Sequence, residues 1–192
     1  MPSSMPHLLT ARKTGISTDF LFYIGSLAPD SVTDRNKKDI VHFRNSTDRE
    51  KSLIDLAAAT DQSFSFKEGV LMHLFLDWKW DIGPSYDFRK HYGNDCFLQY
   101  RDEIGRLGSC LYHNIAWSEE LWNGMLVVKP EDYPLEIDFN PSEVITMLNR
   151  NNIWHKNNEL QPQFYETDEM NAFFEKVAVE YNIWRRIHTW KT

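Results

Sequence analysis

Apolar residues recur at intervals of three and four positions along most of the chain, which is the spacing of amphipathic α-helices. The longest example runs from Met170 through Phe174, Val177 and Tyr181 to Ile187. Runs that alternate apolar and polar residues, as half-buried strands do, are missing from the sequence. The pattern therefore predicts an all-α protein.

Capping residues divide the periodic stretches into separate helices. Helix start signals occur at Ser3 or Ser4, at Thr18 with Asp19, at Thr47 with Glu50, at Asn94 or Asp95, at Ser118 and at Asn140 with Pro141. The stretches 31–45, 82–94 and 151–166 are polar or rich in turn residues, and we expect them to be loops. We expect a single domain over residues 1–192, with roughly six or seven helices bundled around a central helix at residues 69–81.

Composition and charge narrow the class of protein. A chain of 192 residues with 42% apolar and 14% aromatic residues is long enough for one well-buried core. A net charge of −7 gives no general attraction for nucleic acid or for an anionic membrane. The sequence contains no recognisable secretory signal and no apolar run long enough to span a membrane. Cys96 and Cys110 lack the spacing of a metal-binding pair, and we expect them to be buried free thiols. These features indicate a cytoplasmic protein.

The central stretch, GVLMHLFLDWKWD, places three polar residues at four-residue intervals in an apolar run. His73, Asp77 and Asp81 would form one polar line along a helix face. A buried carboxylate needs a cation or strong hydrogen-bond donors beside it. Imidazole and carboxylate are common ligands of zinc and of other transition metals, so the line predicts a metal site.

Further candidate ligands lie upstream of the central helix. His7 points inward with its leucine neighbours, Asp30 follows the turn at Pro29, and His42 has an apolar residue on either side. Helical bundles build metal sites by projecting polar side chains from facing helices into the core. With the central pair, these residues suffice for one closed site or for a two-metal cluster.

The order of these motifs resembles a known family. MPHLLTA, FYIGSLAPD, HF and GVLMHLFLDWKWD follow one another as in the bacterial zinc-dependent phospholipase C family and its single-strand nuclease relatives. The resemblance covers about the first 85 residues and consists of short motifs in a fixed order. It implies a phospholipase C-like fold and zinc ligands at the five positions His7, Asp30, His42, His73 and Asp77, with Asp77 bridging two metals.

Two departures from the family pattern concern the remaining ligands. The chain begins Met1–Pro2, whereas the extracellular members use a tryptophan at the mature N-terminus, and no HxxxE pair occurs downstream. His91 has a suitable four-residue gap to Asp95 but reads as part of a loop. We therefore rank His113, near the end of a helix, above His91 as a further ligand.

The chemistry expected of such a site is metal-assisted hydrolysis. Two close metal ions lower the pKa of a shared water and hold both the attacking and the leaving oxygen of a phosphoester. Asp30 is a candidate ligand or general base, and Asp81 a candidate base or partner of a ligand histidine. Trp78, Trp80 and Tyr86 could wall the substrate pocket, although core packing explains them equally well. We expect one or two zinc ions, with iron, manganese and nickel left open.

The resulting hypothesis is a metal-dependent phosphoester hydrolase acting on a small molecule. One alternative is an HD-type phosphohydrolase, which is disfavoured because the sequence has no His-Asp dipeptide. Another is a non-catalytic helical domain with a structural metal, and a third is an interaction protein that presents Trp184 and Trp190 on its last helix. The oligomeric state and the identity of the substrate stay open at this level.

Overall fold

The computed structural model describes residues 3–58, 64–133 and 139–188, and this part of the chain is helical without a strand, as the sequence predicted. The elements in chain order are α1 (Ser4–Thr14), α2 (Phe20–Gly25), the 3-10 helix η1 (Ala28–Ser31), α3 (Arg35–Val41), α4 (Arg49–Ala58), α5 (Phe64–Ile82), α6 (Pro84–Tyr92), α7 (Phe97–Asn114), α8 (Ser118–Val127), the 3-10 helix η2 (Pro130–Asp132), α9 (Pro141–Asn157) and α10 (Thr167–His188).

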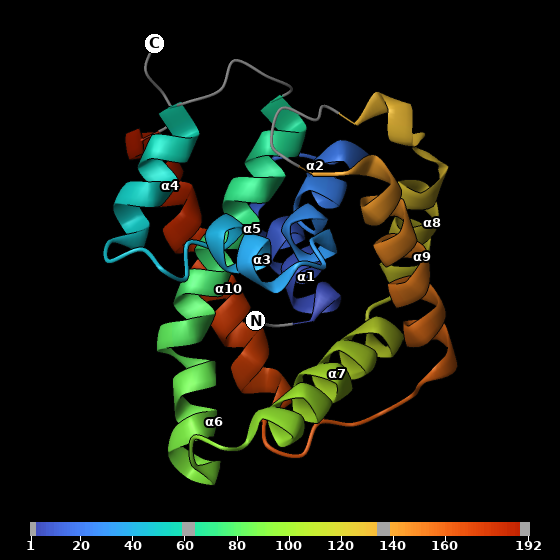
Figure 1. Cartoon of the computed structure of the whole chain (residues 1–192). Helices are drawn as coiled ribbons and strands as arrows, with labels where there is room; N and C mark the ends of the chain where they lie inside the picture. Colours follow the sequence, from blue (N-terminus) through green and yellow to red (C-terminus); the bar gives the residue numbers. More distant parts are fainter. Residues whose placement is uncertain (1–2, 59–63, 134–138, 189–192) are drawn as a thin grey trace.

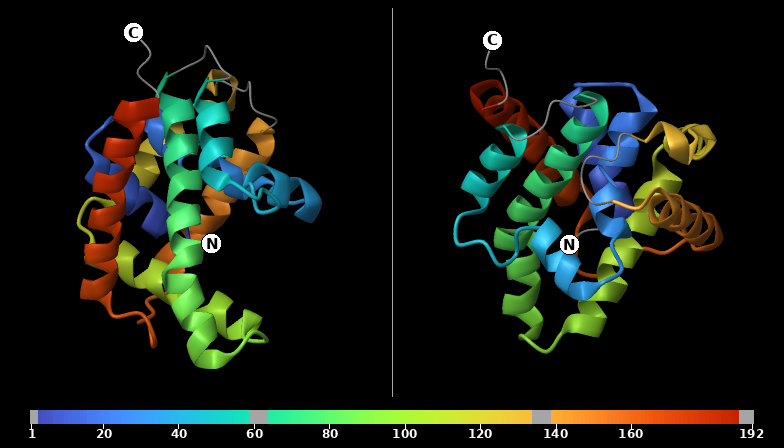
Figure 2. Two further views of the ribbon diagram at one scale, coloured as in Figure 1. Left: turned by 90° about the vertical axis from the view of Figure 1, so that its left-hand side faces the viewer. Right: turned by 45° about the horizontal axis from the view of Figure 1, so that its top comes forward.

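The first helix lies in the middle of the molecule and the others surround it (Figure 1). The α5 helix packs against α2 and α6, and α10 packs along α1. The α8 and α9 helices lie on the opposite side, and α7 crosses between the two groups (Figures 1 and 2). One buried apolar cluster joins these elements, and its fully buried members include Leu8, Phe22, Leu76, Trp122 and Phe174.

Two glycines bring α2 and α5 into backbone contact. A Cβ atom on Gly69 would overlap the carbonyl oxygen of Phe22 and would lie 2.7 Å from the nitrogen of Ser26. A Cβ atom on Gly25 would overlap the carbonyl oxygen of Phe66 in the same way. Only glycine fits at such a close approach, because any side chain would push the helices apart. The contact sets the end of α2 directly beside the first two turns of α5.

Buried carboxylates fix two other contacts. Glu68 on α5 accepts hydrogen bonds from the Tyr181 hydroxyl at 2.7 Å and from Nε of Arg185 at 2.6 Å, which ties α10 to α5. Glu103 on α7 accepts hydrogen bonds from the backbone N–H groups of three successive residues, Gln163 to Tyr165. The second carboxylate holds the segment between α9 and α10 against α7.

The helix boundaries correct several sequence-based expectations. Residues 31–45 and 82–94 are not plain loops, because α3 and α6 form within them. Asp34 caps α3 by accepting a hydrogen bond from the Lys37 N–H at 2.8 Å, and Pro84 occupies the start of α6, where its missing N–H costs nothing. Asp48 rather than Thr47 caps α4, through the Lys51 N–H at 2.9 Å. The bundle accordingly has more helices than we predicted.

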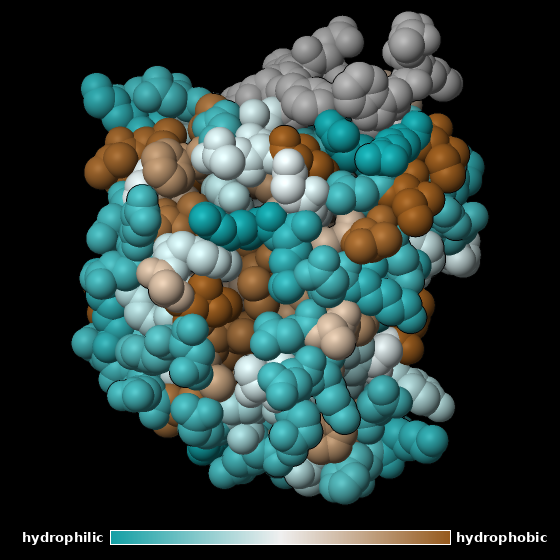
Figure 3. Space-filling model, turned by 180° about the vertical axis from the view of Figure 1, so that it is seen from behind, coloured by the Kyte–Doolittle hydropathy of each residue, from teal (hydrophilic) through white to brown (hydrophobic). Residues whose placement is uncertain are grey.

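The surface adds two observations on partners. None of the helices in the described ranges is both long and apolar enough to cross a bilayer. The face turned away from the viewer in Figure 1 is largely hydrophilic, and its apolar residues form small groups interrupted by polar ones (Figure 3). On α10, Trp184 is buried against Tyr181 rather than presented to solvent, and Trp190 lies outside the described residues. The buried tryptophan contradicts the prediction that Trp184 forms an exposed interaction face.

Candidate metal centre

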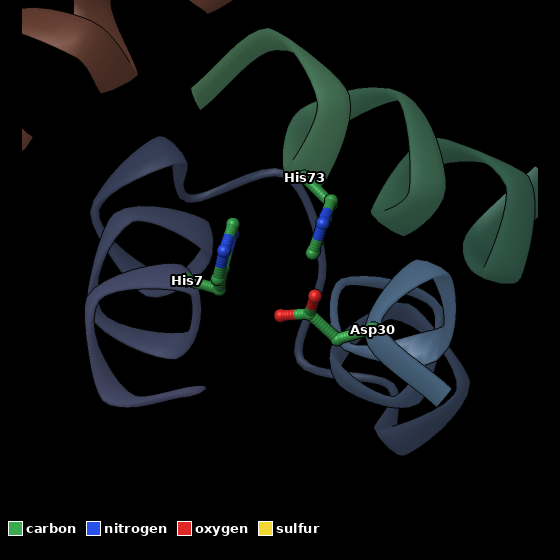
Figure 4. A group of neighbouring side chains, drawn as sticks. All are labelled: His7, Asp30 and His73. Carbon is green, nitrogen blue, oxygen red and sulfur yellow. The ribbon is translucent and has the colours of Figure 1, made fainter. Parts of the chain in front are cut away.

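The structure brings together the five residues of the first half of the chain that the sequence marked as ligands. His7 comes from α1, Asp30 from η1, His42 from the end of α3, and His73 and Asp77 from one face of α5. The rings of His7 and His73 lie parallel, with centroids 3.8 Å apart, and the Asp30 carboxylate points toward the space beside them (Figure 4). Four separate elements thus supply one cluster.

The ligand-type atoms of the cluster lie at regular short distances. Nε2 of His42 and Nε2 of His73 are 3.2 Å apart, and Oδ2 of Asp77 lies 3.5 Å from the first and 3.6 Å from the second. Asp30 adds a fourth atom, because its Oδ1 lies 3.6 Å from Nε2 of His42. His7 approaches the other oxygen of Asp77, with Nε2 3.5 Å from Oδ1. The Asp77 carboxylate therefore faces ligand nitrogens on both of its oxygens.

Backbone carbonyl groups orient two of the histidines. Nδ1 of His73 lies 2.8 Å from the carbonyl oxygen of Ser26, and Nδ1 of His42 lies 2.7 Å from that of Lys38. Because a carbonyl oxygen can only accept, each Nδ1 donates a proton, which leaves Nε2 as the atom through which either ring would bind a metal. The two Nε2 atoms lie 3.2 Å apart, which is close enough for them to share a proton or a metal ion.

Burial leaves polar atoms of the cluster without ordinary partners. His7 and His73 are fully buried, and Asp77 is 2% exposed. Among the described residues, neither oxygen of Asp77 and neither ring nitrogen of His7 has a hydrogen-bond partner. An unsatisfied buried carboxylate is costly, which makes it rare in a folded protein unless a cation compensates for it.

Electrostatics favour the ligand form of two members of the cluster, His7 and Asp77, whereas for His73 the effect of burial is overcome by the neighbouring carboxylates of Asp77 and Asp30, which raise its pKa. Burial, together with His73 nearby, lowers the pKa of His7 to about 3. Burial alone would raise the pKa of Asp77, but His73 and the other two histidines hold it well below its usual range. The site therefore favours a neutral His7 and an ionised Asp77.

The donor set fits a small transition-metal ion. A tetrahedral ion with bonds of about 2.0 to 2.1 Å to nitrogen and oxygen keeps its ligand atoms about 3.3 Å apart. The measured separations among His42, His73 and Asp77 are 3.2 to 3.6 Å. Since Nδ1 of His73 is engaged by Ser26, that ring offers one nitrogen. A second group of ligand-type atoms within 4.8 Å of one another consists of His7, Asp30 and His73, so the two groups share His73.

One candidate ligand, Asp30, reaches the surface. The side chain of Asp30 is 17% exposed, and its Oδ1 lies 2.9 Å from Nζ of Lys38. Both residues line a cavity of about 440 Å³, whose other walls come from the start of α1 and from α7 and α9. The buried cluster is therefore adjacent to a space large enough for a small molecule.

The remaining candidates for metal binding or base catalysis, Asp81, His113 and His91, contact other groups or face solvent. Asp81 pairs with Arg49, with Oδ2 2.8 Å from Nη1, and Nε2 of His113 lies 2.9 Å from the carbonyl oxygens of both His155 and Asn158. His91, the lower-ranked candidate, is exposed on α6. These side chains have partners of their own, which accounts for them without a metal.

The three proposed pocket residues also lie elsewhere. Trp80 is fully buried in the core, stacked on Phe174, and Trp78 packs edge-on against Phe75 on the side of α5 that faces α10. Tyr86 is 56% exposed on α6. Among the described residues, the walls of the cavity beside Asp30 do not include any of the three.

Sequence reasoning missed the residues that surround the ligands. Lys38 contacts Asp30 and supplies the carbonyl group that orients His42, and Arg101 lines the same cavity from α7. The four-residue spacing of Lys38 and His42 was a usable signal once that segment is recognised as helical. Arg101 had no such signal, because nothing local connects α7 to α3. Comparison with protein-family models, with curated proteins and with solved structures gives no match, so the interpretation of the cluster rests on its geometry.

Proposed function

We propose that this protein is a metal-dependent hydrolase of phosphoesters, with zinc as the expected ion and a phospholipase C-like set of ligands. The observation that carries the proposal is the buried Asp77 carboxylate, whose two oxygens face His7, His42 and His73 at 3.5 to 3.6 Å and lack hydrogen-bond partners among the described residues. A cation between these groups would satisfy them together.

The residues around the cavity have separate roles in this proposal. A bound divalent ion supplies a water of lowered pKa and offsets charge on the phosphoryl oxygens. His42 and His73 hold their Nε2 atoms in place through their carbonyl partners, and Asp77 spans the two sides of the cluster. Asp30, the ligand that borders the cavity, is placed to accept a proton from an attacking water.

Lys38 adds positive charge at the mouth of the site. Its ammonium group lies 2.9 Å from Asp30 Oδ1, on the wall of the cavity. In that position it orients the Asp30 carboxylate and attracts an anionic group that enters. These features support a phosphoester rather than a neutral ester as substrate.

A structural ion is the second candidate function, and the deep burial of His7, His73 and Asp77 favours it. A structural zinc site is closed by four protein ligands, whereas a catalytic site keeps a position for water. The partial exposure of Asp30 beside a cavity favours the catalytic alternative.

Elemental analysis of protein purified without chelator tests the proposal first. We expect one or two equivalents of transition metal in the wild type, and none in the variants Asp77→Asn and His73→Ala. Asp55→Asn is the matched control, because Asp55 is 64% exposed and pairs with Lys51 one turn away. Wild-type protein without metal, or Asp77→Asn protein with a full complement, would refute the metal site.

A hydrolysis screen separates the two candidate functions. The substrates are phosphomonoesters, phosphodiesters and short-chain phospholipids, each with the metal-loaded wild type and with Asp77→Asn. Turnover that requires Asp77 supports the hydrolase. Full metal content without turnover of any of the three substrate classes would favour a structural ion.

A further inference from the structure

A basic groove lies next to the candidate metal centre. It has a volume of about 600 Å³ and is lined by four basic residues together with Phe97, Tyr100 and Ile104. The basic residues are Arg35, Lys38, Arg44 and Arg101, and none of the described lining residues is acidic. In a protein with a net charge of −7, such a concentration of positive charge is a local exception.

The groove continues into the cavity beside Asp30. Lys38, Arg101 and Ile104 line both spaces, and Arg150 on α9 adds another guanidinium group to the cavity. Lys38 is also the residue that contacts Asp30 directly. A molecule whose phosphoester reaches the cluster therefore extends along these side chains.

Among the described residues, two of the four basic residues of the groove are paired with carboxylates, and two are not. Arg44 pairs with Asp39 at 2.9 Å and Lys38 pairs with Asp30. In the described part of the chain, Arg35 and Arg101 have no carboxylate partner; Arg101 instead has its guanidinium group 5.8 Å from the centre of the Phe97 ring. Guanidinium groups bind carboxylate and phosphate through paired hydrogen bonds, so two unpaired arginines in a concave surface favour an anion.

The remaining wall of the groove is apolar. Phe97 is 64% exposed at the start of α7 and stands beside Ile104, which is partly buried. An aromatic ring beside an arginine is a suitable surface for a planar or apolar part of a small molecule. Cations and apolar surface thus occur within one groove.

We infer that this groove binds a second anionic group, a carboxylate or phosphate, of the same small substrate whose phosphoester is cleaved at the metal centre. The inference rests on the proposed function and adds the substrate class: a phosphoester with a second negative charge next to an apolar or aromatic part. Arg35 and Arg101 hold the second anion, Lys38 stands between it and the cluster, and Phe97 contacts the apolar part.

Direct binding tests the groove without any turnover. The probe is benzene-1,3,5-tricarboxylate, an aromatic polyanion, and its neutral tricarboxamide is the control ligand, both titrated calorimetrically at low salt. We expect the tricarboxylate to bind wild-type protein and Asp77→Asn protein alike, and to bind the double variant Arg35→Gln/Arg101→Gln about tenfold more weakly. Arg186→Gln, an exposed arginine on α10, is the matched control and should bind as wild type does.

The results distinguish the groove from the proposed function. Absence of tricarboxylate binding, or equal binding by the double variant and the wild type, would overturn the inference. If wild-type protein purified without chelator contains no metal and still binds the tricarboxylate through the two arginines, the groove stands and the hydrolase is refuted. In the metal-loaded enzyme, kcat/KM for 4-carboxyphenyl phosphate should exceed that for its carboxamide analogue about tenfold, and the double variant should abolish the difference. Equal kcat/KM values for the two esters in the wild type would refute the groove while preserving the hydrolase.

Discussion

The close approach of α2 and α5 yields a test in which a remote substitution alters the metal site. We consider Gly69→Ala, which lies one helical turn before His73 on α5. The new methyl group would overlap the carbonyl oxygen of Phe22 and would lie 2.7 Å from the nitrogen of Ser26. Both obstacles are backbone atoms, so relief requires movement of the helices rather than rotation of a side chain.

The expected effect on stability follows from this overlap. Overpacking against a rigid neighbour costs about 3 kcal/mol, and the better helix propensity of alanine offsets about 1 kcal/mol of that. A net loss of about 2 kcal/mol in the free energy of unfolding corresponds to a fall of about 4 to 8 °C in Tm for a domain of this size. The separation also lengthens the 2.8 Å contact between Nδ1 of His73 and the Ser26 carbonyl. Loss of such an orienting partner weakens metal binding about 10- to 100-fold.

Thermal denaturation of metal-free protein and titration with chelator-buffered zinc measure the two effects separately. Gly105→Ala is the control, because its methyl group would lie 3.5 Å from the Trp154 ring, an ordinary contact in the interior of α7. The free energy of unfolding of that variant should rise by up to about 1 kcal/mol, and its zinc affinity should stay that of the wild type. Retention of the wild-type Tm and zinc affinity by Gly69→Ala would refute the reasoning. Losses of Tm and zinc affinity in Gly105→Ala as large as those in Gly69→Ala would refute it as well.

Two further predictions concern buried ionisable groups outside the metal centre. Glu103→Gln should lower the free energy of unfolding by about 3 kcal/mol in urea, since a neutral amide replaces a carboxylate that accepts backbone N–H groups at 2.7 to 3.0 Å. Asp102→Asn is the control, because Asp102 is 59% exposed, and it should change the free energy of unfolding by less than about 0.5 kcal/mol. Equal losses in the two variants would contradict the role assigned to the Glu103 carboxylate. Burial and nearby His113 lower the pKa of His155 to about 4. Between about pH 6.5 and 4 the unfolded chain therefore binds a proton on His155 that the folded protein does not bind. The free energy of unfolding should fall by up to about 3 kcal/mol as the pH drops through this range. His155→Phe should flatten that part of the stability profile, and an unchanged slope would contradict the assignment.

Much of the candidate metal centre could be predicted because its determinants are local. The spacing of His73 and Asp77 depends only on helix geometry, and the apolar residues around them already imply burial. His7 and Asp30 follow from a helix start and from a proline turn, both of which are legible in the sequence. The structure brings these residues together, whereas their occupancy by metal and their activity stay predictions.

Predictions that depended on tertiary contacts were less successful. Asp81 continues the polar line on α5, yet Arg49 from the neighbouring α4 takes up its carboxylate. The period of the helix shows where a side chain points but not which partner another helix supplies. Trp80 illustrates the same limit, because its burial against α10 follows from packing that no local pattern specifies. The groove was unpredictable for this reason, since Arg35 and Arg101 are distant in sequence.

The two halves of the chain contribute differently to the site. All five candidate ligands come from residues 7–77, whereas α7 and α9 supply much of the wall around the cavity. Substitutions on α7 and α9 can thus reshape the space for a ligand while the metal ligands stay untouched. If the proposed function holds, such a division allows selectivity to diverge among related proteins that keep the same His and Asp cluster. It also offers a route for engineering, in which libraries at Arg101 and Arg150 alter what enters without rebuilding the centre itself.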